Sequence, residues 1–337
     1  MNKKASEGII KLSQNENPVG PSPLALKAIK EHGFLINRYP EPHSSTLKVE
    51  LANELALSPD NIFVSAGSIE LLDIFIRNFI GENENIIIPK LTFVAYKIIA
   101  EVFGVTIIFS GMKDYRIDID SILENYNNQT KMIIIANPNN PTGTIISEKE
   151  MIKLLENVSP QTFVVIDEAY CEYVSDSDYP NTFELQKQYP NLITLRTFSK
   201  IYGLAGLRVG YAIAAQDIIE RLDHYQPPFT VNQMAAVAAS ASLKDKKFLK
   251  DSIETNKKTR TRLEKELTGL GYNVIPSEGN FIFIHFDRIE ERDLIFEQLK
   301  DQNVLTRKMD FFGDSKALRI TVPKPDNCQY VIDCLYK

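Results

Sequence analysis

The chain of 337 residues contains no tryptophan and only three cysteines, Cys171, Cys328 and Cys334. An odd number of cysteines cannot all pair within one chain, and the spacing of these three does not match known metal-binding patterns. We therefore expect reduced thiols, no disulfide framework and no metal centre. Because reduced cysteines are typical of cytosolic proteins, this pattern favours a cytoplasmic location.

Long hydrophobic runs are absent as well. The longest apolar stretches, such as "MIIIA" at 132–136 and "FIFI" at 281–284, are far shorter than the roughly 20 residues that a helix needs to cross a bilayer. The N-terminus carries two lysines but lacks the apolar core of a signal peptide. These features predict a cytoplasmic protein with no membrane partner.

Dense basic blocks and a dinucleotide-binding glycine motif are also missing. The formal net charge is −6, and the most basic segments, 244–247 and 256–262, lie in a helical pattern that also carries acidic residues. A solvated helix face explains this pattern better than a nucleic-acid surface. The segment "GLAGLRVG" at 203–210 lacks the G-x-G-x-x-G spacing, which argues against a Rossmann-type dehydrogenase.

What the sequence does contain is a series of short apolar runs rich in β-branched residues, separated mostly by amphipathic, helix-like segments. Seven such runs lie at 61–64, 85–89, 105–109, 131–136, 162–167, 191–196 and 208–213. Continuous apolar strands between helices are typical of a sheet that is buried on both faces. The sequence therefore predicts an α/β fold with a mainly parallel seven-stranded sheet between helices.

The pattern changes along the chain in a way that predicts three parts. Residues 1–40 are rich in proline and asparagine and form an extended arm with one helix near 22–32. Residues 41–244 form a large domain around the sheet. Residues 245–337 form a smaller α+β domain that begins with a long charged helix, at about 245–268.

Polar side chains follow the predicted strands where they end. They are Asn140 in "NPNNPTGT", Asp167 and Tyr170 in "DEAYCEY", Ser199 and Lys200 in "TFSK", and Arg208 where the last strand begins. Alone, each has an ordinary explanation: a turn residue, a helix N-cap, a surface lysine or an edge-strand arginine. Together they gather at the edge where open α/β sheets bind ligands.

A further segment, "SAGSIELL" at 65–72, places Gly67 and Ser68 at the start of a helix. Free backbone N–H groups and the helix dipole favour an anion such as phosphate at that point. An amide, a carboxylate, a phenol, an amine and a guanidinium near a phosphate site match the parts of pyridoxal phosphate, a flat aromatic aldehyde that carries a phosphate. We therefore expect this cofactor.

The segments "NPNNPTG", "DEAYCEY" and "SKIYGLAGLRVGY" resemble those of the fold-type I pyridoxal-phosphate aminotransferases, and most closely the histidinol-phosphate aminotransferase branch. The segments "LSQNENPVGPSP" at 12–23 and "RYPEP" at 38–42 are similar to the N-terminal arm of that branch. The resemblance covers about residues 12–335. It implies a homodimer in which the arm packs on the small domain and on the partner subunit.

The resemblance also implies roles for individual residues. Lys200 would be the Schiff-base lysine, and its amine would move a proton as general base and then as general acid. Asp167 would pair with the pyridine nitrogen and keep it protonated. Asn140 and Tyr170 would hydrogen-bond the phenolic oxygen of the ring, and Phe93 would either stack on the ring or belong to the core. Lys200, Asp167 and Tyr170 are thus the predicted catalytic residues.

The cofactor phosphate would be held by side chains and backbone from several segments. The resemblance implies Gly67, Ser68, Ser199, Arg208 and, from a second subunit, Tyr39 for the phosphate, with Thr197 as a further cofactor-binding residue. An arginine suits this site because its planar fork binds phosphate with two hydrogen bonds. Members of the branch often have an acidic residue where this chain has Ile69, which places the side-chain contacts there in question.

Substrate binding is implied for residues of the arm and of the small domain, namely Asn15, Asn17, Tyr39, Asn280, Arg307 and Arg319, of which the first four would line the mouth of the pocket. Arg307 and Arg319 match two arginines that bind a substrate carboxylate or phosphate in the family. Either could instead be an ordinary salt-bridge partner at a strand edge. A ligand role is favoured for Arg319, because it lies within an apolar strand.

The resemblance implies transamination between an amino donor and 2-oxoglutarate, with histidinol phosphate as the expected donor and histidine biosynthesis as the setting. An aromatic or other amino-acid aminotransferase and a threonine-phosphate decarboxylase share these motifs and stay open as alternatives. A non-catalytic sensor that binds pyridoxal phosphate is a further alternative. It would need a DNA-binding domain before the arm, for which the sequence has no room ahead of residue 12.

Overall fold

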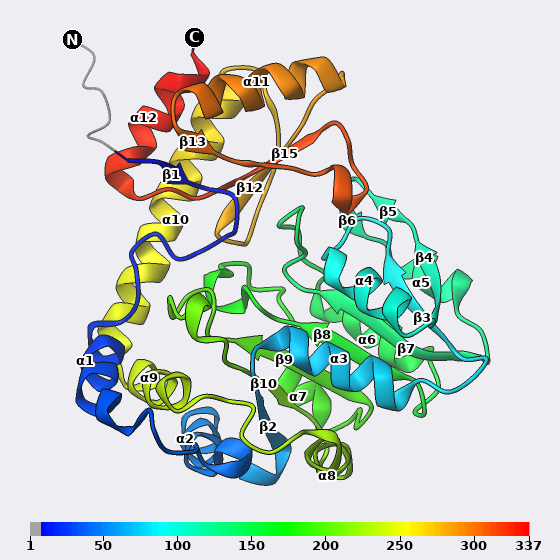
Figure 1. The fold of residues 1–337 in the computed structure, drawn as a ribbon. Coiled ribbons are helices and arrows are strands. Elements are labelled where there is room, and N and C mark those ends of the chain that lie inside the picture. The colour runs from blue at the N-terminus through cyan, green and yellow to red at the C-terminus, as the bar shows by residue number, and fades with distance from the viewer. Residues whose placement is uncertain (1–7, 337) are drawn as a thin grey trace.

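A computed structural model of the chain describes residues 8–336 and is built around one large mixed sheet with a smaller C-terminal domain beside it (Figure 1). The large sheet has seven strands in the order β2-β10-β9-β8-β7-β3-β4. Their bounds are Ile62–Ser65 (β2), Asn85–Pro89 (β3), Thr106–Ser110 (β4), Thr130–Ala136 (β7), Phe163–Asp167 (β8), Leu192–Thr197 (β9) and Gly210–Ile213 (β10). The predicted α/β class and the seven-stranded sheet are confirmed.

All neighbours in this sheet are parallel except at β10, which runs antiparallel to both β2 and β9. Gly210, the first residue of β10, lies opposite Ser65 and Thr197, the last residues of its two neighbours. The start of β10 therefore meets the carboxyl ends of the other strands. This reversal brings the segment before β10, with Arg208, to the edge of the sheet where the ligand of an α/β fold binds.

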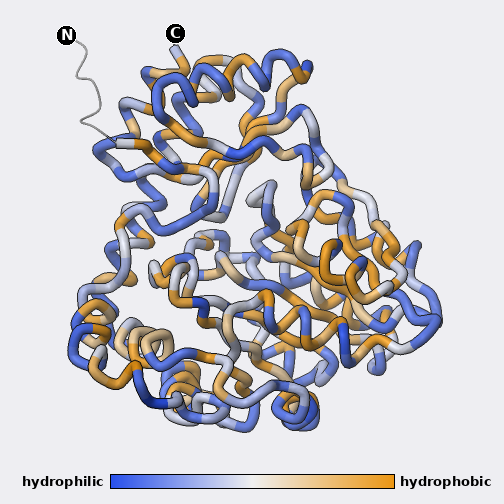
Figure 2. The backbone as a smooth tube through the Cα atoms, in the orientation of Figure 1, coloured by the Kyte–Doolittle hydropathy of each residue, from blue (hydrophilic) through white to orange (hydrophobic). Residues whose placement is uncertain are grey.

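Helices cover both faces of the large sheet, as the alternation of buried strand residues requires. In β3, Ile86 and Ile88 pack in one core cluster, which includes α3, α4 and α8, whereas Ile87 packs in another, with α5, α6 and α7. The helices are α3 (Ser68–Phe79), α4 (Val94–Val102), α5 (Ile119–Asn125), α6 (Glu148–Glu156), α7 (Thr182–Gln186) and α8 (Gln216–Tyr225). Hydrophobic residues are concentrated in the strands and on the packed helices (Figure 2).

The C-terminal domain is an antiparallel sheet in the order β11-β12-β15-β14 with helices beside it. Its strands are β11 (Asn273–Ile275), β12 (Phe281–His285), β14 (Arg307–Lys308) and β15 (Ala317–Thr321). Its helices are α11 (Ile289–Asp301) and α12 (Pro325–Leu335). The long helix α10 (Lys246–Gly269) runs from the large part of the molecule into this domain and contributes Leu263 and Leu267 to its core (Figure 1).

The N-terminal segment connects the two parts of the molecule. Its strand β1 (Ile10–Lys11) pairs with β13 (Val304–Leu305) of the small domain, and its helix α1 (Pro23–His32) packs on α9 (Gln233–Lys244) beside α2 (Ser45–Leu55). Between them the backbone passes so close to Gly203 that a Cβ there would lie 2.3 Å from the carbonyl oxygen of Gly20. Two further short strands, β5 (Met112–Lys113) and β6 (Arg116–Ile117), form a hairpin.

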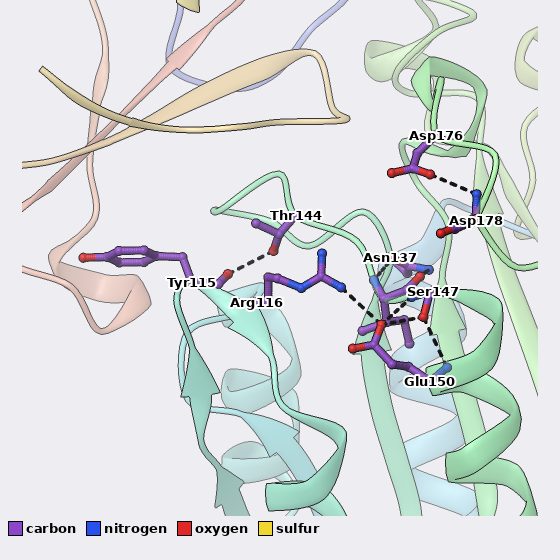
Figure 3. Close-up of polar contacts among 9 residues, drawn as sticks. Tyr115, Arg116, Asn137, Thr144, Ser147, Glu150, Asp176 and Asp178 are labelled. Atoms are coloured by element: carbon purple, nitrogen blue, oxygen red, sulfur yellow. Dashed lines mark hydrogen bonds and ion pairs between the residues drawn. The ribbon is translucent and has the colours of Figure 1, made fainter. Parts of the chain in front are cut away.

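The turn after β7 is held by its own polar side chains (Figure 3). Asn137 Oδ1 accepts a hydrogen bond from the backbone N–H of Ile146 at 3.0 Å, and Asn137 Nδ2 donates to the carbonyl of Ile146. Ser147 and Glu150 form a capping box that begins α6. Because both ends of the turn are fixed in this way, Asn140 is held at the edge of the sheet.

Within residues 8–336, none of the helices combines the length and the apolar character that crossing a lipid bilayer requires.

A buried ion pair joins β9 to the loop that follows β8. Arg196 donates to Glu168 Oε2 from Nη2 at 2.7 Å and from Nε at 2.9 Å, and the Glu168 side chain is fully buried. Thr182 donates to Oε1 of Glu168, and the guanidinium carbon of Arg196 lies 4.4 Å from the centre of the Phe183 ring. The pair therefore holds α7 against the strand ends.

We expect Arg196→Met to lower the free energy of unfolding by about 3–5 kcal/mol, because it leaves a buried carboxylate without its cation. Urea unfolding followed by circular dichroism measures this change. Lys187→Met is the matched control, since its pair with Glu184 is exposed and its loss should change stability by less than about 0.5 kcal/mol. Equal effects of the two substitutions would contradict the buried-pair interpretation.

Candidate active site

A cavity of about 270 Å³ opens at the carboxyl ends of the large-sheet strands, between the large sheet, the N-terminal segment and the small domain. It brings together most of the residues that the sequence singled out. Its lining includes Asn15, Ser68, Phe93, Asn140, Asp167, Tyr170, Thr197, Ser199, Lys200, Arg208, Arg307 and Arg319. Four of the predicted residues, Asn17, Tyr39, Gly67 and Asn280, do not line it.

One end of the cavity is suited to an anion. Arg208 Nη1 donates to Ser199 Oγ at 3.3 Å, and Ser199 is also hydrogen-bonded to Thr197. Helix α3 begins beside them with Ser68, so its free N–H groups face the same region. Gly67 has a φ of +90°, and a Cβ there would lie 2.5 Å from Arg208 Nη2. Only glycine lets the arginine approach the helix start this closely.

Asp167 supplies the carboxylate of the cavity. It is the last residue of β8 and is buried, with one donor on each oxygen: the Tyr96 hydroxyl on Oδ2 at 2.9 Å and the Ala169 N–H on Oδ1 at 3.1 Å. Burial raises the pKa of Asp167 above its ordinary value, while these two hydrogen bonds and the nearby positive charge of Lys200 act in the opposite direction. The helix-cap explanation is not supported, because the 3₁₀ turn that follows has Tyr170 at its N-cap, and Oδ1 instead accepts a bond within the turn two residues on.

Lys200 lies in the loop after β9 and faces the same cavity. Its Nζ is 3.3 Å from the carbonyl oxygen of Gln14 and 5.5 Å from the centre of the Tyr170 ring. Tyr170 is buried beside Phe281, and its hydroxyl accepts a hydrogen bond from Asn15 Nδ2 at 3.0 Å. An amine, a phenol and a carboxylate therefore converge from two neighbouring strand ends.

The small domain contributes two arginines. Arg307 in β14 and Arg319 in β15 are directly opposite one another across two antiparallel strands. Burial lowers the pKa of Arg319 to about 10, and the Arg307 charge acts in the same direction. Arg319 donates to Asn140 Oδ1 and to the carbonyl of Ser13, but its buried Nε has no partner within residues 8–336. Two like charges at facing positions are unfavourable unless an anion lies between them.

Asn17 and Asn280 have structural contacts in place of a position at the cavity. Asn17 Nδ2 donates to the carbonyl of Ile201 at 2.7 Å, and Asn280 Nδ2 donates to the carbonyl of Asn15 at 3.0 Å. Both amides hold the N-terminal segment in place. Asn17 and Asn280 therefore do not line the cavity as predicted. They hold in place the N-terminal segment, whose residues Ser13–Asn15 do line it.

Tyr39 lies away from the cavity, with 84% of its surface exposed and its ring 5.0 Å from that of Phe229. Its expected role in a second subunit stays a prediction. Ile69 lines the cavity, and no carboxylate occupies that position. The next residue, Glu70, accepts a hydrogen bond from the Ala66 N–H at 2.6 Å and so closes the turn ahead of α3.

The sequence did not reveal Tyr96, Phe312, Ser13 or Gln14, which also line the cavity. For Tyr96 a signal existed, because it stands three residues after Phe93, the N-cap of α4, and residues at this spacing are neighbours on a helix. Ser13 and Gln14 contribute carbonyl oxygens, which no residue type reveals. Phe312 comes from a single 3₁₀ turn, Asp310–Phe312, that no periodic pattern marks.

Comparisons with known proteins agree with this geometry. The sequence profile of the family "Aminotransferase class I and II" matches residues 7–335. A histidinol-phosphate aminotransferase of Anaeromyxobacter sp. (strain Fw109-5) is 39% identical over 315 residues, which cover 93% of this chain and 86% of that protein. The histidinol-phosphate aminotransferase of Sinorhizobium meliloti, solved in complex with pyridoxal-5′-phosphate, is 25% identical with a TM-score of 0.92, covering 97% of this chain and 89% of that one. The enzyme of the same name from Clostridium acetobutylicum is 27% identical with a TM-score of 0.89, covering 97% and 98%.

The matched profile spans almost the whole chain, and the relatives are similar over nearly their full lengths. The structural neighbours share both the large sheet and the smaller domain. The resemblance to the fold-type I aminotransferases is therefore confirmed, and the chain belongs to the class I and II aminotransferase family.

Proposed function

We propose that the protein is a histidinol-phosphate aminotransferase that uses pyridoxal phosphate and exchanges the amino group with the 2-oxoglutarate/glutamate pair. In histidine biosynthesis the reaction would run toward histidinol phosphate, with glutamate as the amino donor. The observation that carries the proposal is one cavity lined by the amine of Lys200, the carboxylate of Asp167 and an anion-binding end around Arg208. The sequence similarity of the relatives supports the choice of substrate.

The residues present fit the cofactor. The close approach of Arg208 to the glycine before α3 and the hydroxyl of Ser199 supply a phosphate site. Asp167 has acceptor capacity left on both oxygens for the pyridine nitrogen, and Lys200 would join the cofactor covalently. Asn140 and Tyr170 would orient the ring through its phenolic oxygen. When bound, the cofactor supplies an electron sink for the charge that develops when the substrate loses a proton.

The protein's own groups would then carry out binding and proton transfer. Nζ of Lys200 would take the proton from the carbon that bears the substrate amine and later return one, as general base and acid. Asp167 would keep a positive charge on the pyridine nitrogen. The N-terminal segment at Ser13–Asn15 would limit the access of water to these groups, since it lines the cavity and bonds to Lys200 and Tyr170.

Arg307 and Arg319 would bind the anionic end of the substrate. Histidinol phosphate carries a phosphate and the 2-oxoglutarate/glutamate pair carries carboxylates, so both substrates have a group that can lie between the two guanidiniums. The two guanidiniums line the same cavity at facing positions and repel one another when no anion is present, which supports this role.

A homodimer and a cytoplasmic location belong to the same proposal. The exposed ring of Tyr39 beside Phe229 supports the dimer, since the family resemblance assigns this tyrosine to the phosphate site of a second subunit. Exposed apolar side chains on the neighbouring segment, Phe34 and Ile36, also favour a covered surface there.

Lys200→Ala should abolish the covalent attachment of pyridoxal phosphate and lower the transamination rate by roughly 10³-fold or more, because both the attachment point and the proton carrier are lost. Borohydride reduction followed by peptide mass spectrometry shows the attachment site, and a coupled assay gives the rate. Lys187→Ala, an exposed lysine far from the cavity lining, should behave as wild type. Full activity of Lys200→Ala would refute the assignment.

Arg319→Met should raise the KM for histidinol phosphate by roughly 10- to 100-fold, since a charge-assisted hydrogen bond to the substrate anion is lost. Steady-state kinetics measure this change. Arg116→Met, which removes a surface pair with Glu150, is the control. An unchanged KM in Arg319→Met would exclude this arginine from the anion site.

Among amino donors, histidinol phosphate should give the highest kcat/KM, ahead of phenylalanine, while threonine phosphate should not be decarboxylated. The reason is that the paired arginines suit a phosphate and the comparisons favour this substrate. Single-turnover spectra with each donor, together with carbon dioxide release, separate the three possibilities. A preference for phenylalanine, or release of carbon dioxide, would overturn the proposed substrate.

A further inference from the structure

Tyr96 is a fully buried tyrosine whose hydroxyl has one hydrogen-bond partner among the described residues, the Asp167 carboxylate. It lies in the first turn of α4, with its backbone N–H bonded to the carbonyl of Phe93. The rings of Phe93 and Tyr96 meet edge to face, with centroids 5.6 Å apart. One helical turn thus presents an aromatic ring to the cavity and a hydroxyl to the carboxylate.

The direction of this hydrogen bond follows from the protonation of the two groups. Burial, followed by the charge of Asp167, raises the pKa of the Tyr96 hydroxyl well above its ordinary value, so the phenol keeps its proton. An ionised carboxylate can only accept, so the phenol donates. Each donor on a carboxylate favours its charged form. Tyr96 therefore opposes the effect that burial has on Asp167.

We propose that Tyr96 is a positioning residue, whose hydroxyl holds the Asp167 carboxylate ionised and in a fixed orientation for the nitrogen of the bound cofactor. This inference rests on the proposed function. The core around the ring supports it, because Tyr96 packs in the cluster that includes Ala136 and Ala100 and its ring cannot shift without disturbing that cluster. A phenylalanine would fill the same space, so packing alone does not account for the hydroxyl.

Other charged groups also influence whether Asp167 is ionised or neutral. Lys200, from the loop after β9, favours the ionised form, and Glu168, the next residue in the chain, disfavours it. Glu168 is held by Arg196 and Thr182, so its charge is partly neutralised. Tyr170 is a neighbour of the phenol itself. Of these groups, only Tyr96 contacts the carboxylate side chain through a side-chain hydrogen bond.

The test compares wild type with Tyr96→Phe, which removes the hydroxyl and keeps the ring. Equilibrium dialysis measures the dissociation constant of pyridoxal phosphate, and the ¹⁵N NMR shift of the labelled ring nitrogen reports whether it is protonated. We expect the dissociation constant to rise roughly 10- to 100-fold, as for the loss of a hydrogen bond to a charged group. The ring-nitrogen signal should move toward that of neutral pyridine.

Two controls separate the loss of the Tyr96–Asp167 hydrogen bond from general structural effects of removing a buried hydroxyl. Tyr126→Phe removes another phenol, one that bonds Ser159 and Thr162 and does not line the cavity, and it should change neither quantity. In an Asp167→Asn background, Tyr96→Phe should have little further effect, since the interaction that it supports is already lost.

Each outcome decides the inference. A dissociation constant within about twofold of wild type with an unmoved ¹⁵N signal overturns it, as does an undiminished effect of Tyr96→Phe in the Asp167→Asn background. Failure of the proposed function would look different, because wild type itself would then bind no pyridoxal phosphate and borohydride would trap nothing on Lys200.

Discussion

A carboxylate that must stay charged although it is buried is the constraint on which the site depends. Burial raises the pKa of Asp167 and so favours the neutral acid, which could not stabilise a cation beside it. The fold meets this constraint locally: α4 supplies the Tyr96 hydroxyl, the chain after β8 supplies the Ala169 N–H, and the loop after β9 supplies the Lys200 charge. The parallel pairing of β8 and β9 brings Lys200 beside Asp167, and the packing of α4 on the same sheet brings Tyr96 there.

The N-terminal segment is the third component of the site, because it bonds to both larger parts at once. The carbonyl oxygens of Ser13, Gln14 and Asn15 accept hydrogen bonds from Arg319, Lys200 and Asn280 respectively. The side chain of Asn15 adds a bond to Tyr170, and its backbone N–H donates to Thr321. A segment with these contacts couples the position of the small domain to the phenol of the large one. Backbone groups make most of these contacts. The contacts therefore depend on the course of the backbone through this segment more than on its side chains.

The fold could be read from the sequence because buried strands leave a strong signal. The run "NIIIP" coincides with β3, and the runs near 131 and 162 begin within one residue of β7 and β8. The antiparallel direction of β10 has no such signal, since direction depends on the loop that precedes it. The site residues at strand ends were also predictable, because a recognised strand shows where its end lies and which residues follow it. Asn17 and Asn280 were predicted for the pocket mouth, yet their amides bind backbone carbonyls. The sequence shows that an asparagine side chain can form hydrogen bonds, but it does not show which group the amide binds.

Asp167 and Glu168 show how adjacent residues of one type can serve different ends. Both are buried acids at the end of β8, and the alternation of side chains along a strand sends them to different surroundings. Glu168 meets a cation and a hydroxyl, Arg196 and Thr182, so its charge is compensated by the protein itself. In the part of the chain that the structure describes, the hydrogen-bond donors on Asp167 are neutral, and Lys200 acts from a distance. A carboxylate that is hydrogen-bonded but not paired can still accept a cation from a ligand, whereas one already held by a guanidinium cannot. Glu168 is therefore a structural acid, because its charge is already paired with Arg196. Asp167 can serve the site, because its hydrogen bonds leave it able to pair with a cation of the ligand.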